Sequence, residues 1–151
     1  EKIMNHVIVT GCDANLLMFL SELRKPAVNG GSYHPIVVVS PTKPSKWDII
    51  RAKYNDIYLV IGNVIKMETF KRINVNNAFS FVLLASRDDV TVVDNESVDA
   101  KTLFAYLRLE QFIPKNVMFS VELTTTSNMT GKLDSLSVEN CVWSSHRMCA
   151  V

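Results

Sequence analysis

The sequence lacks the features that would anchor it in a membrane or hold it together with disulfide bonds. Its apolar residues come in short runs, far below the roughly 18 consecutive apolar residues that a spanning helix needs. Cysteine is scarce, because Cys12, Cys141 and Cys149 are the only three, with no C-x-x-C pair among them. We therefore interpret all three as free thiols in a reducing compartment.

The amino terminus also lacks a basic stretch followed by an apolar one, so we expect no secretory signal and a chain that begins at a domain edge. An excess of charge of one sign is missing too. Lys and Arg number 16 against 15 Asp and Glu, a formal net charge of +1, which gives no reason to expect binding to nucleic acid or to an anionic membrane. With 151 residues the chain has the length of one ordinary domain.

Apolar runs rich in β-branched residues alternate with segments of helical periodicity. We expect strands at residues 6–10, 36–40, 57–61, 79–85 and 117–123. Helices are expected at 16–23, from 45 to 54 behind a capping box of Ser45 and Asp48, at 67–73, and from 98 to 112. This alternation predicts an α/β fold: a Rossmann-like, doubly wound, mainly parallel sheet with helices on both faces. After Met129 the pattern weakens, and the stretch near Cys141 fits either a helix or a strand.

The turn after the first expected strand is where such folds hold the pyrophosphate of a dinucleotide. Only Gly11 remains of the G-x-G-x-x-G glycines, while Asp13 puts a carboxylate where a phosphate needs room and Leu16 fills the third position. At the end of the second strand, Ser40 replaces the acid that would bind a ribose. The degenerate loop of Gly11, Asp13 and Ser40 therefore predicts no bound cofactor. A tight turn better explains Gly11, and a helix N-cap better explains Asp13.

Three stretches carry a resemblance to a known family: residues 57–63, 99–104 and 121–129. The sequence Asp99-Ala-Lys-Thr102 resembles the start of a helix in that family, and Glu122-Leu123 with Asn128-Met129 resemble its Glu-Leu and Asn-Met signatures. The family is that of the cytoplasmic RCK (regulator of K⁺ conductance) domains of Slo-type, BK-type ligand-gated potassium channels. These signatures favour the second such domain of a channel subunit.

The resemblance implies a regulatory, non-catalytic domain. RCK domains assemble with other RCK domains into the gating ring of a homo-tetrameric channel, so this one would lie in the cytoplasm while the parent protein is membrane-embedded. It implies an RCK Rossmann-like lobe at residues 1–129 and a C-terminal extension at 130–151 that leads toward a truncated second lobe. The helices expected at 16–23 and 98–112 are the natural assembly faces.

The family carries a Gly-Asp pair after the third strand, where this sequence reads Gly62-Asn63. An amide in place of the carboxylate weakens a nucleotide or cation interpretation at that point. We interpret Gly62 as a left-handed residue that closes the strand.

Acidic residues are concentrated after the fourth expected strand, and they supply enough oxygen donors for a hard cation such as Ca²⁺. They are Asp88, Asp89, Asp94, Glu96 and Asp99. Their order is not that of an EF-hand loop, and an acidic run before a helix can equally be a solvated cap stabilised by the helix dipole. Both interpretations stay open. The resemblance leaves open whether Ca²⁺ or Na⁺ is the regulatory ion.

Enzyme motifs are missing from the sequence. It has no nucleophile elbow, H-E-x-x-H or P-loop, and we interpret His6, His34 and His146 as structural. Two other classes remain as alternatives: a nucleotide-sensing RCK/KTN subunit of a potassium uptake system, or a divergent NAD-binding oxidoreductase domain. Both would need phosphate-compatible glycines and an acid after the second strand. A third alternative is a purely structural RCK domain that binds no ligand.

Overall fold

The computed structural model describes residues 2–11, 16–25, 33–85, 95–124 and 142–144. Its centre is a six-stranded sheet in the order β3-β2-β1-β4-β5-β6. All of the strand pairs are parallel. The strands are β1 (Val7–Thr10), β2 (Ile36–Ser40), β3 (Ile57–Ile61), β4 (Ser80–Leu83), β5 (Met118–Leu123) and β6 (Val142–Ser144).

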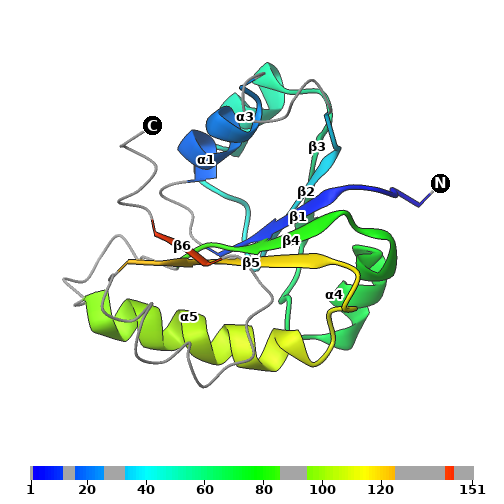
Figure 1. Ribbon diagram of the computed structural model, residues 1–151. Helices are drawn as coiled ribbons and strands as arrows, with labels where there is room; N and C mark the ends of the chain where they lie inside the picture. The colour runs from blue at the N-terminus through cyan, green and yellow to red at the C-terminus, as the bar shows by residue number, and fades with distance from the viewer. Residues whose placement is uncertain (1, 12–15, 26–32, 86–94, 125–141, 145–151) are drawn as a thin grey trace.

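Helices cover both faces of this sheet (Figure 1). On one face, α1 (Leu16–Leu23) and α3 (Trp47–Lys53) pack apolar side chains such as Leu20 and Ile50 onto Val9 and Val38. On the other face lie α4 (Met67–Arg72), the 3₁₀ turn η1 (Val75–Asn77) and α5 (Asn95–Glu110). Strands buried on both faces read as continuous apolar runs because neither face meets water.

The strand order and the two-sided layering confirm the predicted Rossmann-like, doubly wound α/β fold. Strands β2 and β3 have the predicted bounds, and the other three expected strands are shorter by one to three residues than predicted. The N-cap of α3 is one residue later than the predicted Ser45. It is Lys46, whose side chain makes no capping hydrogen bond. The carboxylate of Asp48, in the first turn of α3, pairs with Lys43 at 2.8 Å.

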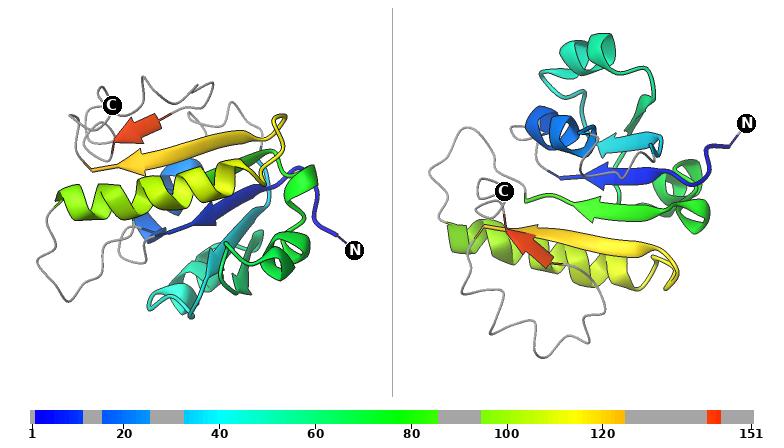
Figure 2. Two further views of the ribbon diagram at one scale, coloured as in Figure 1. Left: turned by 90° about the horizontal axis from the view of Figure 1, so that it is seen from below. Right: turned by 45° about the horizontal axis from the view of Figure 1, so that its top comes forward.

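The weakly patterned end of the sequence contributes a sixth strand. Of the two possibilities left open near Cys141, the strand is correct, since β6 pairs in parallel with β5 through Val121 and Val142. Figure 2 shows β6 beside β5 at one edge of the sheet, with β3 at the other edge. In the described part of the chain, no helix has the length and apolarity to cross a bilayer.

The amino-terminal end of β1 is fixed by a buried histidine. His6 is fully buried, and its Nε2 donates a hydrogen bond of 2.8 Å to the carbonyl oxygen of Ile73 at the end of α4. Because a carbonyl only accepts, Nε2 carries the proton, and Nδ1 is left buried without a hydrogen-bond partner. Burial lowers the pKa of His6 from its usual 6.5, although the hydrogen bond to Ile73 acts in the opposite direction.

This geometry predicts a loss of stability in mild acid. The unfolded chain binds a proton on His6 near pH 6.5, whereas the folded chain resists it, so the free energy of unfolding should fall as the pH drops below 6.5 toward the lower folded pKa. Urea unfolding across a pH series would measure this. The His6→Gln variant should lose this part of the pH dependence, while the His34→Gln control should keep it. A wild-type stability that stays flat below pH 6.5 would contradict a buried neutral ring.

Candidate functional site

The strand order places a switch point between β1 and β4. The chain leaves β1 toward β2 on one side and later returns to β4 on the other, so the two strands end side by side and their connections diverge. In doubly wound sheets, ligands bind in the crevice outside the carboxyl ends of the strands at such a point. This edge is therefore the place to look for a functional site.

Gly11 follows β1 at this crevice and lies close to the end of β4. Its φ is +118°, and a Cβ atom built on it would lie 2.1 Å from the carbonyl oxygen of Leu84, which follows β4. The backbones are held together by the N–H of Leu84, which donates to the carbonyl of Thr10 at 2.7 Å. Gly11 thus allows the two strand ends to lie close together, while the turn that follows it lies outside the described residues.

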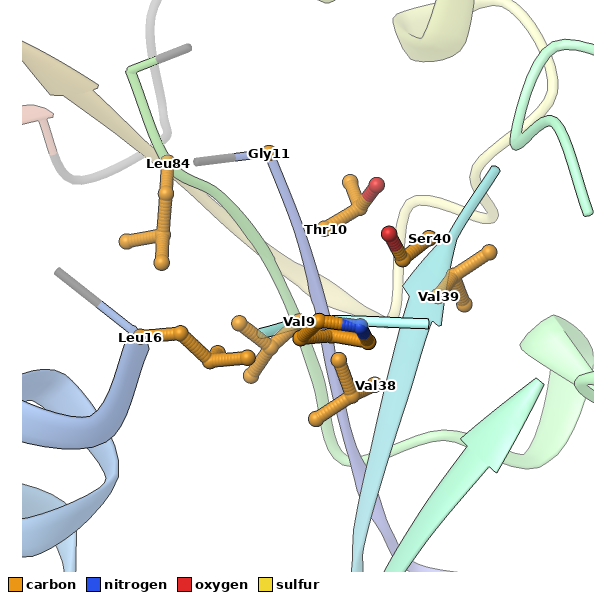
Figure 3. Close-up of a pocket in the computed structure, with 9 residues that line it drawn as sticks. Val9, Thr10, Gly11, Leu16, Val38, Val39, Ser40 and Leu84 are labelled. Carbon is orange, nitrogen blue, oxygen red and sulfur yellow. The ribbon is translucent and has the colours of Figure 1, made fainter. Parts of the chain in front are cut away.

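The space that remains beside Gly11 is small. It is a cavity of about 10 Å³ lined by apolar side chains, with Thr10 and Ser40 as its hydroxyl-bearing residues. Figure 3 shows those two hydroxyls pointing toward one another, with Leu16 and Leu84 on the opposite side. Such a volume holds about one water molecule, whereas small-molecule pockets measure roughly 300–1,000 Å³. The third residue of the predicted degenerate loop, Asp13, lies outside the described residues.

Two buried carboxylates occupy the next part of the same edge. Glu122 on β5 is buried, and its Oε2 accepts a hydrogen bond of 2.9 Å from the N–H of Ala85. Asp99 on α5 is fully buried, and its Oδ1 accepts bonds from the N–H of Thr124 at 2.7 Å and from its hydroxyl at 2.8 Å. Bonds to charged acceptors are among the stronger ones in proteins, so these acids fix the chain just after β4 and just after β5.

Among the residues predicted for a cation, the structure places two. Asp99 lies inside α5 with the partners just given, and Glu96 occupies the first turn of that helix. Asp88, Asp89 and Asp94 fall outside the described residues. Within the described ranges no group of three or more His, Cys, Asp and Glu side chains could hold a metal ion. The predicted Ca²⁺ set stays a prediction.

The interpretation of Gly62 as a left-handed residue was wrong. Among the described glycines only Gly11 has a positive φ. Gly62 is needed for space instead, because a Cβ there would lie 2.8 Å from Oγ1 of Thr69 on α4. The side chain of the neighbouring Asn63 bonds to its own loop, because its Oδ1 accepts a hydrogen bond of 3.0 Å from the N–H of Ile65.

Sequence reasoning did not find the roles of Glu122 and Asp99 in holding the backbone. One signal was available for Glu122: it is a charged residue inside a strand whose neighbours are apolar, and buried acids nearly always have partners. The partners themselves left no signal, because two of the three donors are backbone N–H groups. Among the large aromatic residues of this region, Trp47 and Tyr54 pack in or against the core beside α1, while Tyr58 is exposed.

A parallel, doubly wound sheet with helices on both faces defines a Rossmann-like α/β domain. Residues 2–128 match the family described as the calcium-activated potassium channel slowpoke-like RCK domain. The match covers most of the sequence, so the chain belongs to this family, and the predicted resemblance is confirmed.

Solved structures support the fold. The crystal structure of the TrkA-N domain of the inner membrane protein ybaL from Escherichia coli is similar, with a TM-score of 0.57 and 13% identity over 99% of this chain and 94% of that chain. The GsuK RCK domain is similar with a TM-score of 0.58 and 15% identity over 92% of this chain, which spans 25% of that protein's chain. Among curated proteins no match is found. At these identities the structural likeness establishes the fold alone.

Substitution of Gly11 tests whether its close approach to the Leu84 backbone depends on glycine. Gly11→Ala should destabilise the fold by about 3 kcal/mol, because the side chain meets the Leu84 backbone and the backbone angle is strained for any L-residue. Gly62→Ala is the matched control and should cost less, since its φ is ordinary and its neighbour is a side chain. Denaturant unfolding would measure both. Equal costs for the two variants would show that the turn does not depend on glycine.

Proposed function

We propose that this domain is a non-catalytic gating module of a Slo-type potassium channel, which couples intracellular ion binding and assembly to pore opening. The observation that carries the proposal is the match of residues 2–128 to the slowpoke-like RCK family, in a chain whose cavity beside Gly11 measures about 10 Å³. A domain of this kind would act through its loops and its exposed faces.

The sequence of the first turn and the small cavity beside it argue against the nucleotide-sensing and oxidoreductase alternatives. The second glycine of the G-x-G-x-x-G pattern lets the backbone approach a pyrophosphate, and this sequence has Asp13 at that position. The cavity beside Gly11 measures about 10 Å³. Ser40, at the end of β2, offers a neutral hydroxyl where a ribose would bind a carboxylate. We propose that the domain binds no dinucleotide and has no enzymatic activity.

Ion sensing would rest on the acidic residues between β4 and α5. The two ends of that stretch are described: Ala85 is held by Glu122, and α5 begins at Asn95. A cation bound there would add contacts between two elements already fixed to the sheet edge. A bound ion shifts a gate only if it prefers one arrangement of the channel over the other. We propose Ca²⁺ as the ion, with Na⁺ as the competing choice.

Thermal unfolding with and without ions tests this proposal. At 100 times its dissociation constant, a ligand that binds only the folded chain adds about 2.7 kcal/mol to the free energy of unfolding. We expect millimolar Ca²⁺ to raise the midpoint relative to EDTA at constant ionic strength, and Na⁺, NAD and NADH to leave it unchanged.

The control for this experiment is the Asp88→Asn/Asp89→Asn variant, which should lose the Ca²⁺ shift. The Glu110→Gln variant removes an acid at the other end of α5 and should keep it. A shift of the midpoint with NAD or NADH would contradict the proposal that no dinucleotide binds and would support a nucleotide sensor. The absence of any ion shift would remove ion sensing from this domain and leave assembly as its role.

Assembly with other RCK domains would use α5. Its buried side chains, Leu103, Tyr106 and Leu109, face the sheet. On the same helix, Phe104 is 70% exposed and Leu107 is 39% exposed. These two lie three residues apart on one helical face, so they form an apolar pair directed away from the core. By contrast, α1 exposes one large apolar side chain, Met18. We propose that the exposed face of α5 is the contact with a neighbouring domain, within a cytoplasmic ring of a membrane-embedded homo-tetramer.

Charged substitutions on this face test the contact. Phe104→Asp with Leu107→Asp should weaken self-association at least about tenfold, because an aromatic anchor is replaced by a charge that must be desolvated. Met18→Asp, a charged substitution at an exposed position of α1, should leave association unchanged. Sedimentation over a concentration series would give the self-association constant of each chain. Equal self-association of the wild-type chain and the α5 variant would exclude the α5 face as the contact.

A further inference from the structure

The β3 edge of the sheet is open among the described strands, and its chemical character is distinct. β3 pairs only with β2, and the bonds from Ile36 N–H to Asp56 and from Gly62 N–H to Ser40 fix which of its backbone groups face inward. The N–H and C=O groups of the alternate residues therefore face outward. Those residues are Ile57, Leu59 and Ile61. An open strand edge is a template for another polypeptide unless side chains block it.

Two arginines reach this edge from opposite faces of the sheet. Arg51, from α3, donates through Nη1 to the carbonyl of Ile57 at 3.4 Å. Arg72, from α4, donates through Nη1 to the carbonyl of Ile61 at 3.1 Å. A guanidinium carries five donors, and within the described residues these arginines use one nitrogen each. The remaining donors can bind an acceptor from outside.

The surrounding surface is basic although the whole chain is nearly neutral. Residues 41–72 contain seven Lys and Arg against three Asp and Glu, whereas the net charge of the full chain is +1. Two of the three acids already form intramolecular ion pairs, Asp48 with Lys43 and Asp56 with Arg24. All seven basic residues are exposed: Lys43, Lys46, Arg51, Lys53, Lys66, Lys71 and Arg72. A partner that fits this surface is acidic.

The edge is also partly apolar. Tyr58 is 42% exposed and Ile61 is 44% exposed, and alternation along β3 directs them to opposite sides of the edge. The four steps from Ile57 to Ile61 correspond to about 13 Å of strand. Side chains of an extended segment alternate between its two faces, and the two arginines come from opposite faces. Carboxylates an odd number of residues apart, such as five, with an apolar residue between them, would therefore meet a guanidinium at each end.

We propose that the β3 edge, with Arg51 and Arg72 at its ends, docks an extended acidic segment of a partner polypeptide. Guanidinium groups bind carboxylates with paired hydrogen bonds, so the two arginines fix both position and register. They also occupy the outward carbonyls of Ile57 and Ile61, which opposes indiscriminate strand addition. Because the arginines converge on a line from opposite faces, the arrangement suits a chain better than a flat anionic membrane. This inference is independent of ion sensing and of the α5 contact.

A labelled peptide tests the proposal on the 151-residue chain. The probe is fluorescein-Gly-Asp-Ser-Val-Ser-Ser-Asp-Gly, whose two Asp residues point to opposite faces of an extended strand. Its matched control has Asn in place of both Asp residues. Fluorescence anisotropy at low ionic strength should show binding of the acidic peptide, weakened by salt. Arg51→Gln with Arg72→Gln should weaken binding about tenfold or more, because two charged hydrogen-bonding groups are removed. Lys101→Gln with Arg108→Gln, an equal loss of charge on exposed positions of α5, should leave it unchanged.

The Arg51→Lys/Arg72→Lys variant keeps the charge and serves if the Gln variant fails to fold. It should bind with intermediate affinity, because a lysine lacks the forked donors. Equal binding of the Asn peptide, or equal weakening by the α5 variant, would reduce the effect to total charge and overturn the proposal. So would binding to phosphatidylserine vesicles without binding to the peptide, which would make the surface a membrane contact.

Discussion

The rest of the structure depends on the approach of two strand ends, β1 and β4, at the switch point of the sheet. Their backbones come so close at Gly11 and Leu84 that no side chain fits between them. In a dinucleotide-binding domain the first glycine of this turn also serves the tight turn, and the second lets the backbone approach the pyrophosphate. Gly11 stands at the first of these positions, and its lack of a side chain lets β1 and β4 pair as far as their ends.

Buried acids order the backbone at the same edge of the sheet. Glu122 accepts a hydrogen bond from the N–H of Ala85, and Asp99 accepts one from the N–H of Thr124. The segments that follow β4 and β5 therefore start from fixed points, whatever they bind. An acid fixed to the scaffold needs no ligand for this ordering.

Periodicity determined most of what could be predicted from the sequence. The core strands are apolar on both faces, so β2 and β3 were found with their bounds, and the doubly wound layering followed from their alternation with helices. The absence of a dinucleotide site, which rests on Asp13, Leu16 and Ser40, stays a prediction. Packing distances were out of reach: only the structure shows that Gly62 makes room for Thr69 and that Asp48 turns to Lys43. Edge contacts such as Arg72 to Ile61 join residues 11 apart, and no repeat in the sequence marks them.

The position of β1 in the middle of the sheet has a consequence for the order in which the chain folds. Ile8 pairs with Val37 on one side and with Phe81 on the other, so one partner lies 29 residues away and the other 73. Pairings close in sequence cost less loop entropy and form earlier, while distant ones wait. We expect β1, β2 and β3 to assemble as an early unit on which β4 docks later. The contact between Gly11 and Leu84 then forms only when β4 docks.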